Sequence, residues 1–259
     1  MELFYRELGE GAPIVVLHGV FGTSDNWLTT SKGLAENHKV YLLDLRNHGQ
    51  SFHSDIFTYD AMAEDVKNFI ANHHIVNPVI LGHSMGGKVA MQYARNYDDF
   101  SKLIVVDISP RFYKRHHDDI LTGLNSLDLN AITTRQQADE QLSAHVPELG
   151  VRQFLLKNLY RNEENKFAWR LNLKVLTDKI DVVGEALPED TRISKPALFI
   201  RGGLSRYIQE KDEVLIRRLF ADVQIRTVEG AGHWVQAEKP REFVEVVKEF
   251  LGENQVLQA

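Results

Sequence analysis

Short apolar runs, each bounded by Gly, Pro, Asn or Asp, alternate with helical patterns along most of this sequence. The runs are "PIVVLHG" from Pro13, "KVYLLDL" from Lys39, "PVILGHS" from Pro78, "KLIVVDIS" from Lys102, "PALFIRGG" from Pro196 and "VQIRTVEG" from Val223. Continuous apolar runs are typical of parallel strands that are covered on both faces. Strands that alternate with helices predict right-handed βαβ units and a mostly parallel sheet flanked by helices, an α/β fold.

Two helices and one further strand complete this pattern. Residues 63–70 and 243–251 repeat apolar side chains at helical spacing: Ala63, Val66, Phe69 and Ile70 in the first, and Phe243, Val247 and Leu251 in the second. The N-terminal run "LFYREL" predicts a strand at the edge of the sheet.

The alternation stops between Pro110 and Lys195. Here the apolar pattern is helical, and two faces stand out: Ile120, Leu121, Leu124 and Leu127, then Val151, Phe154, Leu155 and Leu159. So long a stretch without a core strand predicts an insertion. We therefore expect a core built from residues 1–109 and 191–259, with a helical cap at 110–190 inserted before the last two strands. The polar tail "GENQVLQA" is expected to be loose.

Composition excludes several classes of protein. The 259 residues include no cysteine, which rules out disulfides and thiolate metal sites and fits a reducing compartment. The formal net charge of −6 argues against a nucleic-acid partner. The N-terminus lacks the pattern of a signal peptide, and no apolar run approaches the ~20 residues of a membrane span. We expect a cytoplasmic monomer or small homo-oligomer.

The stretch "GHSMGGKVA" at residues 82–90 resembles two different loops. A phosphate-binding loop needs a hydroxyl after its Gly-Lys pair to bind magnesium, and position 89 is Val. Lys88 is then expected to be a solvated residue of a helix. Read as G-x-S-x-G between a strand and a helix, the same stretch predicts a sharp turn that exposes Ser84 as a nucleophile. The helix N-terminus and the Met85 N–H would then stabilise a developing oxyanion.

A serine nucleophile needs a base, and His233 in "EGAGHWVQAEKP" is the best candidate, because it follows the last expected strand. The other histidines are expected to serve the structure: His83 packs in the elbow and His18 braces its loop. We expect His38, His53 and His145 at the surface. The pairs at 73–74 and 116–117 are unsuited to a metal, because adjacent residues do not share a helix face.

The loop "LHGVFG" at residues 17–22 follows a strand and consists mostly of small residues. It predicts the second oxyanion donor, the N–H of Val20 or otherwise that of Phe21.

Taken together, "LHGVFG", "DLRNHGQS", "GHSMGG" and "GAGHWVQAEKP" resemble the α/β-hydrolase superfamily over nearly the whole chain. The set is most similar to the YbfF-type esterases and their eukaryotic abhydrolase relatives, with Asn47 where most relatives have Gly. This resemblance implies hydrolysis of esters or acyl thioesters, including acyl-CoA, with no metal and no organic cofactor. A carbon–carbon hydrolase or a cofactor-free perhydrolase could use the same triad, whereas the intact nucleophile, base and oxyanion loop argue against a binding module.

The acid of the triad departs from the commonest pattern of this superfamily. The usual position, in the loop after "PALFIRGG", holds Ser205, and Asp212 lies further on in an expected helix. Asp107 ends the preceding strand, "LIVVDIS", beside the elbow strand, so we expect it to orient His233. The YbfF-type resemblance points to the same position. Asp44 is expected to be structural.

The substrate-binding residues are the least constrained. Candidates are Trp169, Tyr207, Trp234 and Arg111. Leu124, Leu127, Phe154 and Leu159 are expected to pack against each other, whereas the alternating Phe167, Trp169, Leu171 and Leu173 could cover the serine. The charged run "RFYKRHH" is expected to be solvated. A sharper hypothesis makes Arg111, Lys114 and Arg115 a docking patch for the phosphates of a coenzyme A thioester.

Overall fold

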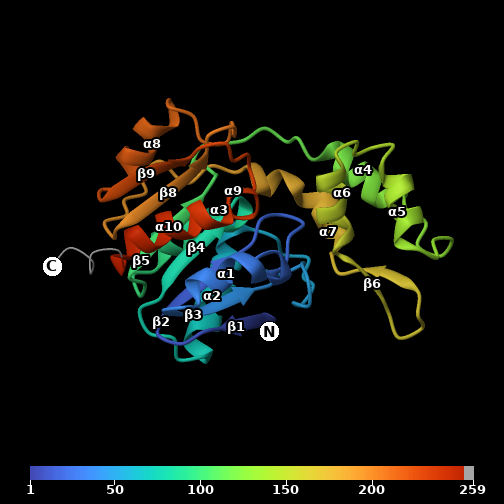
Figure 1. Cartoon of the computed structure of the whole chain (residues 1–259), viewed down its shortest axis with the longest axis horizontal. Helices are drawn as coiled ribbons and strands as arrows, with labels where there is room; N and C mark the ends of the chain where they lie inside the picture. Colours follow the sequence, from blue (N-terminus) through green and yellow to red (C-terminus); the bar gives the residue numbers. More distant parts are fainter. Residues whose placement is uncertain (254–259) are drawn as a thin grey trace.

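A seven-stranded sheet forms the centre of the molecule (Figure 1). The computed structural model describes residues 1–253, so most of the tail predicted to be loose, residues 254–259, lies outside the described part. The strand order is β1-β3-β2-β4-β5-β8-β9. The strands are β1 (Tyr5–Leu8), β2 (Ala12–Leu17), β3 (His38–Leu43), β4 (Val79–His83), β5 (Lys102–Val106), β8 (Ala197–Gly202) and β9 (Val223–Val228).

Six of these strands are parallel, and they coincide with the six apolar runs of the sequence. β1 runs antiparallel to β3, with Tyr5 opposite Leu43, which confirms the predicted edge strand. Because all parallel strands end at the same edge, β4 and β5 bring residues 84 and 107 to neighbouring positions there.

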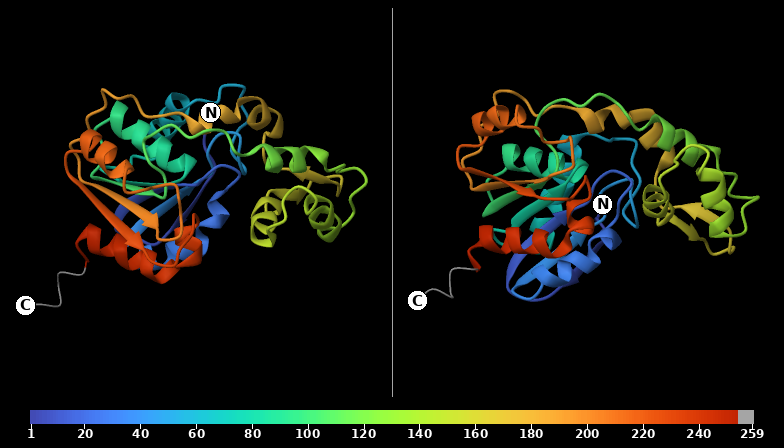
Figure 2. Two further views of the ribbon diagram at one scale, coloured as in Figure 1. Left: turned by 90° about the horizontal axis from the view of Figure 1, so that it is seen from above. Right: turned by 45° about the horizontal axis from the view of Figure 1, so that its top comes forward.

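Helices cover both faces of the sheet (Figure 2). Side chains alternate along β2: Val15 and Leu17 belong to one apolar cluster, Ile14 and Val16 to the other. This explains why the strand is continuously apolar. The helices of the core, with a short 3-10 turn η1 (Ser24–Asn26), are α1 (Leu28–Leu34), α2 (Tyr59–Asn72), α3 (Met85–Asn96), α8 (Asp212–Leu219), α9 (Val235–Glu238) and α10 (Pro240–Leu251).

The segment between β5 and β8 forms a group of elements beside the sheet, which we call the inserted lobe (residues 110–190; Figures 1 and 2). It contains the expected helices, but also a two-stranded antiparallel hairpin. Its elements are α4 (Asp118–Ser126), α5 (Arg135–Leu142), α6 (Leu149–Leu156), β6 (Leu159–Arg161), β7 (Phe167–Trp169), α7 (Leu173–Lys179) and the 3-10 turn η2 (Ile180–Gly184).

The hairpin corrects the prediction that residues 151–159 form one helical face. Helix α6 ends at Leu156, and Leu159 begins β6, where it lies opposite Trp169. The turn is closed by Asn162, whose N–H donates to the Lys166 carbonyl, and by Asn165 at a φ of 58°. Asn tolerates this left-handed conformation better than most residues. The alternation of Phe167, Trp169 and Leu171 was therefore partly the signature of a strand.

Among the described residues, no helix has both the length and the apolar character that crossing a membrane requires.

Candidate active site

Ser84 occupies the turn between β4 and α3, and its backbone is strained, with φ 53° and ψ −120°. The neighbouring glycines make this turn possible. A Cβ on Gly82 would lie 2.1 Å from the Gly86 oxygen, and one on Gly86 would lie 2.3 Å from the Leu17 oxygen. A non-glycine residue in the left-handed region is uncommon and is over-represented at functional sites. The geometry is that of a strand–turn–helix elbow.

His233 lies between Ser84 and Asp107. Its Nδ1 is 2.7 Å from Asp107 Oδ2, and its Nε2 is 3.1 Å from Ser84 Oγ. A carboxylate can only accept, so Nδ1 carries the hydrogen and Nε2 is free to accept from the serine hydroxyl. The structure thus brings together the three residues that the sequence singled out, from three separate loops.

Asp107 is fully buried directly after β5, with a φ of 49°. Its carboxylate also accepts hydrogen bonds from the Gly202 N–H, at 3.1 Å, and from the Ser205 hydroxyl. The contact of Ser205 was not predicted. Its signal was present in the sequence, because Ser205 occupies the position where most related proteins carry the acid.

Asp212 contacts other residues than His233. It begins α8, accepts from the Gln209 N–H at 2.9 Å, and pairs with Arg111 at 3.1 Å. Its role in the fold is therefore to anchor the start of α8 and the Arg111 side chain.

Three backbone N–H groups face no protein acceptor near the serine. In residues 1–253, Val20, Phe21 and Met85 donate no backbone hydrogen bond. The loop is held by Gly22, whose N–H donates to the Gly19 carbonyl at 2.9 Å. Asn158, at the start of the hairpin in the inserted lobe, donates its Nδ2 to the Phe21 carbonyl at 2.7 Å. This loop can therefore present an N–H to an oxyanion without losing an existing bond.

Buried histidines surround the site and are neutral near pH 7. Burial lowers the pKa of His18 to about 4 and that of His83 well below its usual value. His18 donates Nδ1–H to the Gly19 carbonyl and accepts from the Leu45 N–H, so it braces its loop as expected. His83 donates to the His233 carbonyl at 2.9 Å. His53 is exposed, whereas His38 is buried against Glu253, which corrects its predicted surface position.

A cavity of about 540 Å³ opens above Ser84 and extends between the core and the inserted lobe. The residues that line it include Val20, Phe21, Val151, Phe154, Leu155, Tyr207 and Trp234. Phe154 of α6 packs against Trp234, with ring centroids 5.6 Å apart. Tyr207 and Trp234, two of the candidate substrate-binding residues, thus line this cavity.

Three sequence predictions about substrate binding are corrected, those for Phe154, Trp169 and Arg111. Phe154 lines the cavity instead of packing only within the lobe. Trp169 lies in the β6–β7 hairpin, outside the lining. Arg111 is paired with Asp212 and lies over the Tyr113 ring, and Arg115 pairs with Asp118 and Asp181. The guanidinium of Arg111 is therefore already engaged, whereas Arg115 is exposed, as predicted for the charged run, although it is paired with carboxylates.

Lys88 is buried, which contradicts the prediction that it is a solvated residue. Only 2% of it is exposed, and its Nζ donates to the carbonyls of Arg111 and Glu185 at 2.6 and 2.7 Å. Burial lowers the pKa of this ammonium group to about 7.

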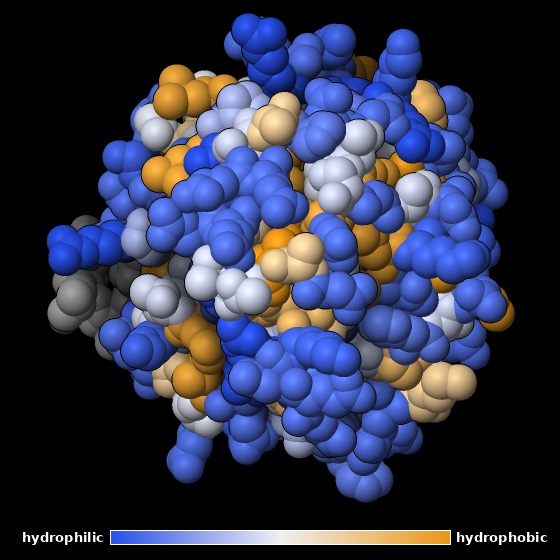
Figure 3. Space-filling view, turned by 90° about the vertical axis from the view of Figure 1, so that its right-hand side faces the viewer, coloured by the Kyte–Doolittle hydropathy of each residue, from blue (hydrophilic) through white to orange (hydrophobic). Residues whose placement is uncertain are grey.

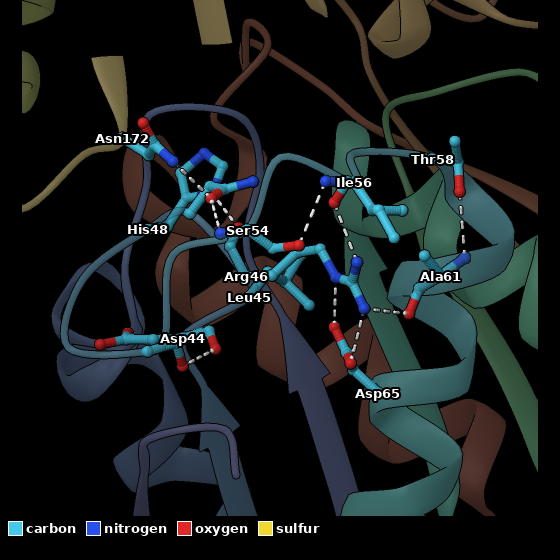
Figure 4. Close-up of polar contacts among 12 residues, drawn as sticks. Asp44, Leu45, Arg46, His48, Ser54, Ile56, Thr58, Ala61, Asp65 and Asn172 are labelled. Atoms are coloured by element: carbon cyan, nitrogen blue, oxygen red, sulfur yellow. Dashed lines mark hydrogen bonds and ion pairs between the residues drawn. The ribbon is translucent and has the colours of Figure 1, made fainter. Parts of the chain in front are cut away.

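The loop after β3 contacts the inserted lobe through Asn172 (Figure 4). Asp44 is structural, as predicted, since it accepts from the N–H groups of Ser24 and Gln50. Arg46 forms a buried ion pair with Asp65 at 2.6 Å. Asn47, with a φ of 67°, accepts two hydrogen bonds from Asn172 of the lobe. The positive φ explains why Gly is usual here, and the Asn side chain adds a contact to the lobe that Gly cannot make.

The chain is similar to known proteins over most of its length. The model of the Alpha/beta hydrolase family matches residues 14–246. The chain is 39% identical to the mouse (Mus musculus) sn-1-specific diacylglycerol lipase ABHD11, over 92% of this chain and 80% of that protein. It is 37% identical to esterase YbfF of Escherichia coli K12, over 93% and 94%.

Among solved structures, a marine microorganism esterase superposes with a TM-score of 0.93 at 40% identity, covering 96% of this chain and 99% of that one. The fold, the elbow and the extent of these matches lead to one conclusion. The chain belongs to the alpha/beta hydrolase family.

Proposed function

We propose that Ser84 is the nucleophile, His233 the general base and Asp107 the residue that orients it, in a hydrolase of carboxylic esters. The chain is a carboxylesterase-type serine hydrolase. One observation carries the assignment of roles: the continuous line of hydrogen bonds from Ser84 Oγ through His233 to Asp107. The carbon–carbon hydrolase and perhydrolase alternatives are not favoured, because the relatives are esterases and lipases.

In the first half of the reaction, Ser84 Oγ attacks the ester carbonyl carbon while His233 Nε2 takes the hydroxyl proton. The tetrahedral intermediate then collapses, the bond to the leaving alcohol breaks, and His233 returns the proton to that oxygen. In the second half, water adds to the acyl-serine with the same proton transfer and releases the acid. Asp107 stabilises the imidazolium that forms in each half.

The oxyanion would be stabilised by the N–H of Met85, at the start of α3, and by that of Val20 or Phe21. The support is that these groups have no other acceptor within residues 1–253. Preorganised donors of this kind contribute about 10²–10³ in turnover each.

The substrate class follows from the cavity. Its walls are mostly apolar, with Val151, Phe154 and Leu155 on the lobe side and Phe21 and Trp234 on the core side. Apolar side chains are also visible between polar ones on the lobe side of the surface (Figure 3). We therefore infer that the inserted lobe acts as a cap and that the enzyme prefers neutral esters with an extended apolar acyl group.

Oxygen esters are a better fit than coenzyme A thioesters. A coenzyme A substrate carries phosphates that need cations, and two of the three cations in the hypothetical patch, Arg111 and Arg115, are already paired with carboxylates. Within the described residues, only the exposed Lys114 of that patch forms no ion pair. Acyl thioesters are therefore the second candidate class, to be compared in the same substrate screen.

The nucleophile is tested by Ser84→Ala and a fluorophosphonate probe. Hydrolysis should fall by roughly a million-fold, and covalent labelling should disappear from a protein that remains folded. Ser205→Ala is the matched control, because Ser205 also touches Asp107 but should leave the labelling site intact. Labelling that persists in Ser84→Ala would contradict the assignment.

We further propose a cytoplasmic location and a monomeric or small homo-oligomeric state. The absence of cysteine supports the location. Cell fractionation and light scattering would test the two statements separately.

A further inference from the structure

Lys88 is a buried lysine that the reaction itself does not use. It lies one helical turn after Ser84, and its N–H donates to the Ser84 carbonyl at 3.1 Å. Lysine is almost never fully buried unless its charge is paired. Lys88 has no carboxylate partner among the described residues, and its ammonium group instead contacts two carbonyls and the face of the Tyr113 ring, 5.3 Å away. Burying a charge without a carboxylate partner costs free energy, so we ask what this arrangement stabilises.

The two carbonyls belong to the two ends of the inserted lobe. Arg111 lies in the outgoing connection (residues 110–117), which leads from the sheet to α4. Glu185 lies in the returning connection (residues 184–191), which leads from η2 toward β8. The Lys88 ammonium group therefore binds both the outgoing and the returning connection between the core and the inserted lobe.

The two connections also bind each other. Tyr113 N–H donates to the Gly184 carbonyl, and Leu187 N–H to the Pro110 carbonyl, each at 2.8 Å. A Cβ at Gly184 would lie 2.1 Å from the Tyr113 oxygen, so this close approach requires glycine. The junction is a small, continuous hydrogen-bonded unit with Lys88 beneath it.

This junction reaches the active site. The Tyr113 hydroxyl donates to the Tyr207 carbonyl at 2.5 Å, and Tyr207 stacks on His233. The outgoing connection continues into His116 and His117, which line the cavity next to α4. A displacement of the junction would therefore move the lobe wall relative to Ser84.

We propose that Lys88 is a positioning residue that fixes the inserted lobe relative to Ser84 and so determines how well long acyl groups bind. The inference rests on the proposed esterase function and deepens it. An acetyl group occupies only the space beside Ser84, whereas a long acyl chain must contact Val151 and Phe154 on the lobe. The KM of a long-chain ester should therefore depend on the position of that wall, whereas the KM of an acetyl ester should not.

Lys88→Met removes the ammonium group while keeping most of the apolar stem. The carbonyls of Arg111 and Glu185 then lose a buried donor, which weakens the junction from below. Lys102→Met is a matched control, because Lys102 Nζ also donates to a carbonyl, that of Phe250 at 2.8 Å, and also lies over an aromatic ring. Lys102 begins β5 and ties the sheet to α10, far from the lobe.

The experiment compares kcat and KM for an acetyl and an octanoyl ester in the wild type and both variants. We expect Lys88→Met to raise KM for the octanoyl ester roughly tenfold, to leave KM for the acetyl ester within about twofold, and to change kcat little. Lys102→Met should alter neither KM. An equal change for both esters in Lys88→Met, or the same chain-length effect in Lys102→Met, would overturn the inference.

Two further results keep the outcomes distinct. If the wild type hydrolyses neither ester, the proposed function fails and the role of Lys88 falls with it; if only the difference in KM is missing, the role of Lys88 alone is wrong. If Lys88→Met does not fold, amide hydrogen exchange of the wild type tests instead whether the junction is fixed. The N–H groups of Tyr113 and Leu187 should exchange as slowly as those of α3, and fast exchange of both would refute a fixed junction.

Discussion

The ring of Tyr207 lies almost parallel to the imidazole of His233, with centroids 3.8 Å apart and an angle of 18° between the planes. Tyr207 is itself held at three points. Its hydroxyl lies 2.7 Å from His116 Nε2, its N–H donates to Ser205 Oγ, and its carbonyl accepts from Tyr113. The stack covers one face of the base while leaving both ring nitrogens to Asp107 and Ser84.

Tyr207→Leu should lower kcat about tenfold, because an aromatic face stabilises the imidazolium that forms during the reaction by ~0.5–2 kcal/mol. Tyr207→Phe keeps the stack but loses the contact to His116, so it should stay within about threefold of the wild type. Steady-state kinetics at saturating ester measure the difference. Equal losses in Leu and Phe variants would assign the effect to the hydroxyl group instead.

Asp107→Asn should lower kcat by about 10⁴ with little change in KM, since the amide cannot stabilise the imidazolium or fix its tautomer. Asp212→Asn is the contrasting variant. It should retain kcat within about threefold, yet lose about 2–4 °C in Tm, because it weakens the buried contacts to Arg111 and Gln209. If Asp212→Asn lost activity and Asp107→Asn kept it, the acid of the triad would be Asp212 and not Asp107.

Phe154→Ala should raise KM for an octanoyl ester roughly tenfold, because the acyl chain loses apolar contact with the lobe wall, an effect of ~1–3 kcal/mol. Trp169→Ala removes a larger side chain from the hairpin outside the cavity lining. We expect it to affect Tm more than KM. A larger change of KM in Trp169→Ala than in Phe154→Ala would show that the cavity is not the acyl site.

Lys88 should make the free energy of unfolding depend on pH. Its pKa is about 7 in the folded protein against 10.5 for the ordinary side chain. Below pH 7 it is protonated in both states. Between these values only the unfolded chain binds the proton, so its contribution to stability rises with pH, by at most ~1.4 kcal/mol per unit.

The contribution of Lys88 is the difference in the free energy of unfolding between wild type and Lys88→Met, measured by urea unfolding at pH 6.5 and 8.5. The wild type should gain stability relative to the variant at the higher pH. Lys102→Met, measured in parallel, controls for the general loss of a lysine. A constant difference across both pH values would mean that Lys88 keeps its ordinary pKa in the fold.

The sequence by itself determined the sheet, the elbow and the triad candidates. Parallel strands buried on both faces are encoded locally as continuous apolar runs, and a sharp turn into a helix admits only Gly on either side of Ser84. The role of Asp107 could also be predicted from the sequence, because the end of β5 must lie beside the end of β4 in such a sheet. These features depend on neighbouring residues or on the order of strands.

Only the tertiary structure decided which polar and aromatic side chains are buried, and against what. Lys88 looks like a surface residue because its carbonyl partners lie 23 and 97 positions away. Arg111 looks free until α8 brings Asp212 beside it, and Phe154 and Trp169 exchange their expected roles once a hairpin replaces the end of a helix. Such environments arise from contacts between distant segments, which hydrophobic periodicity does not record.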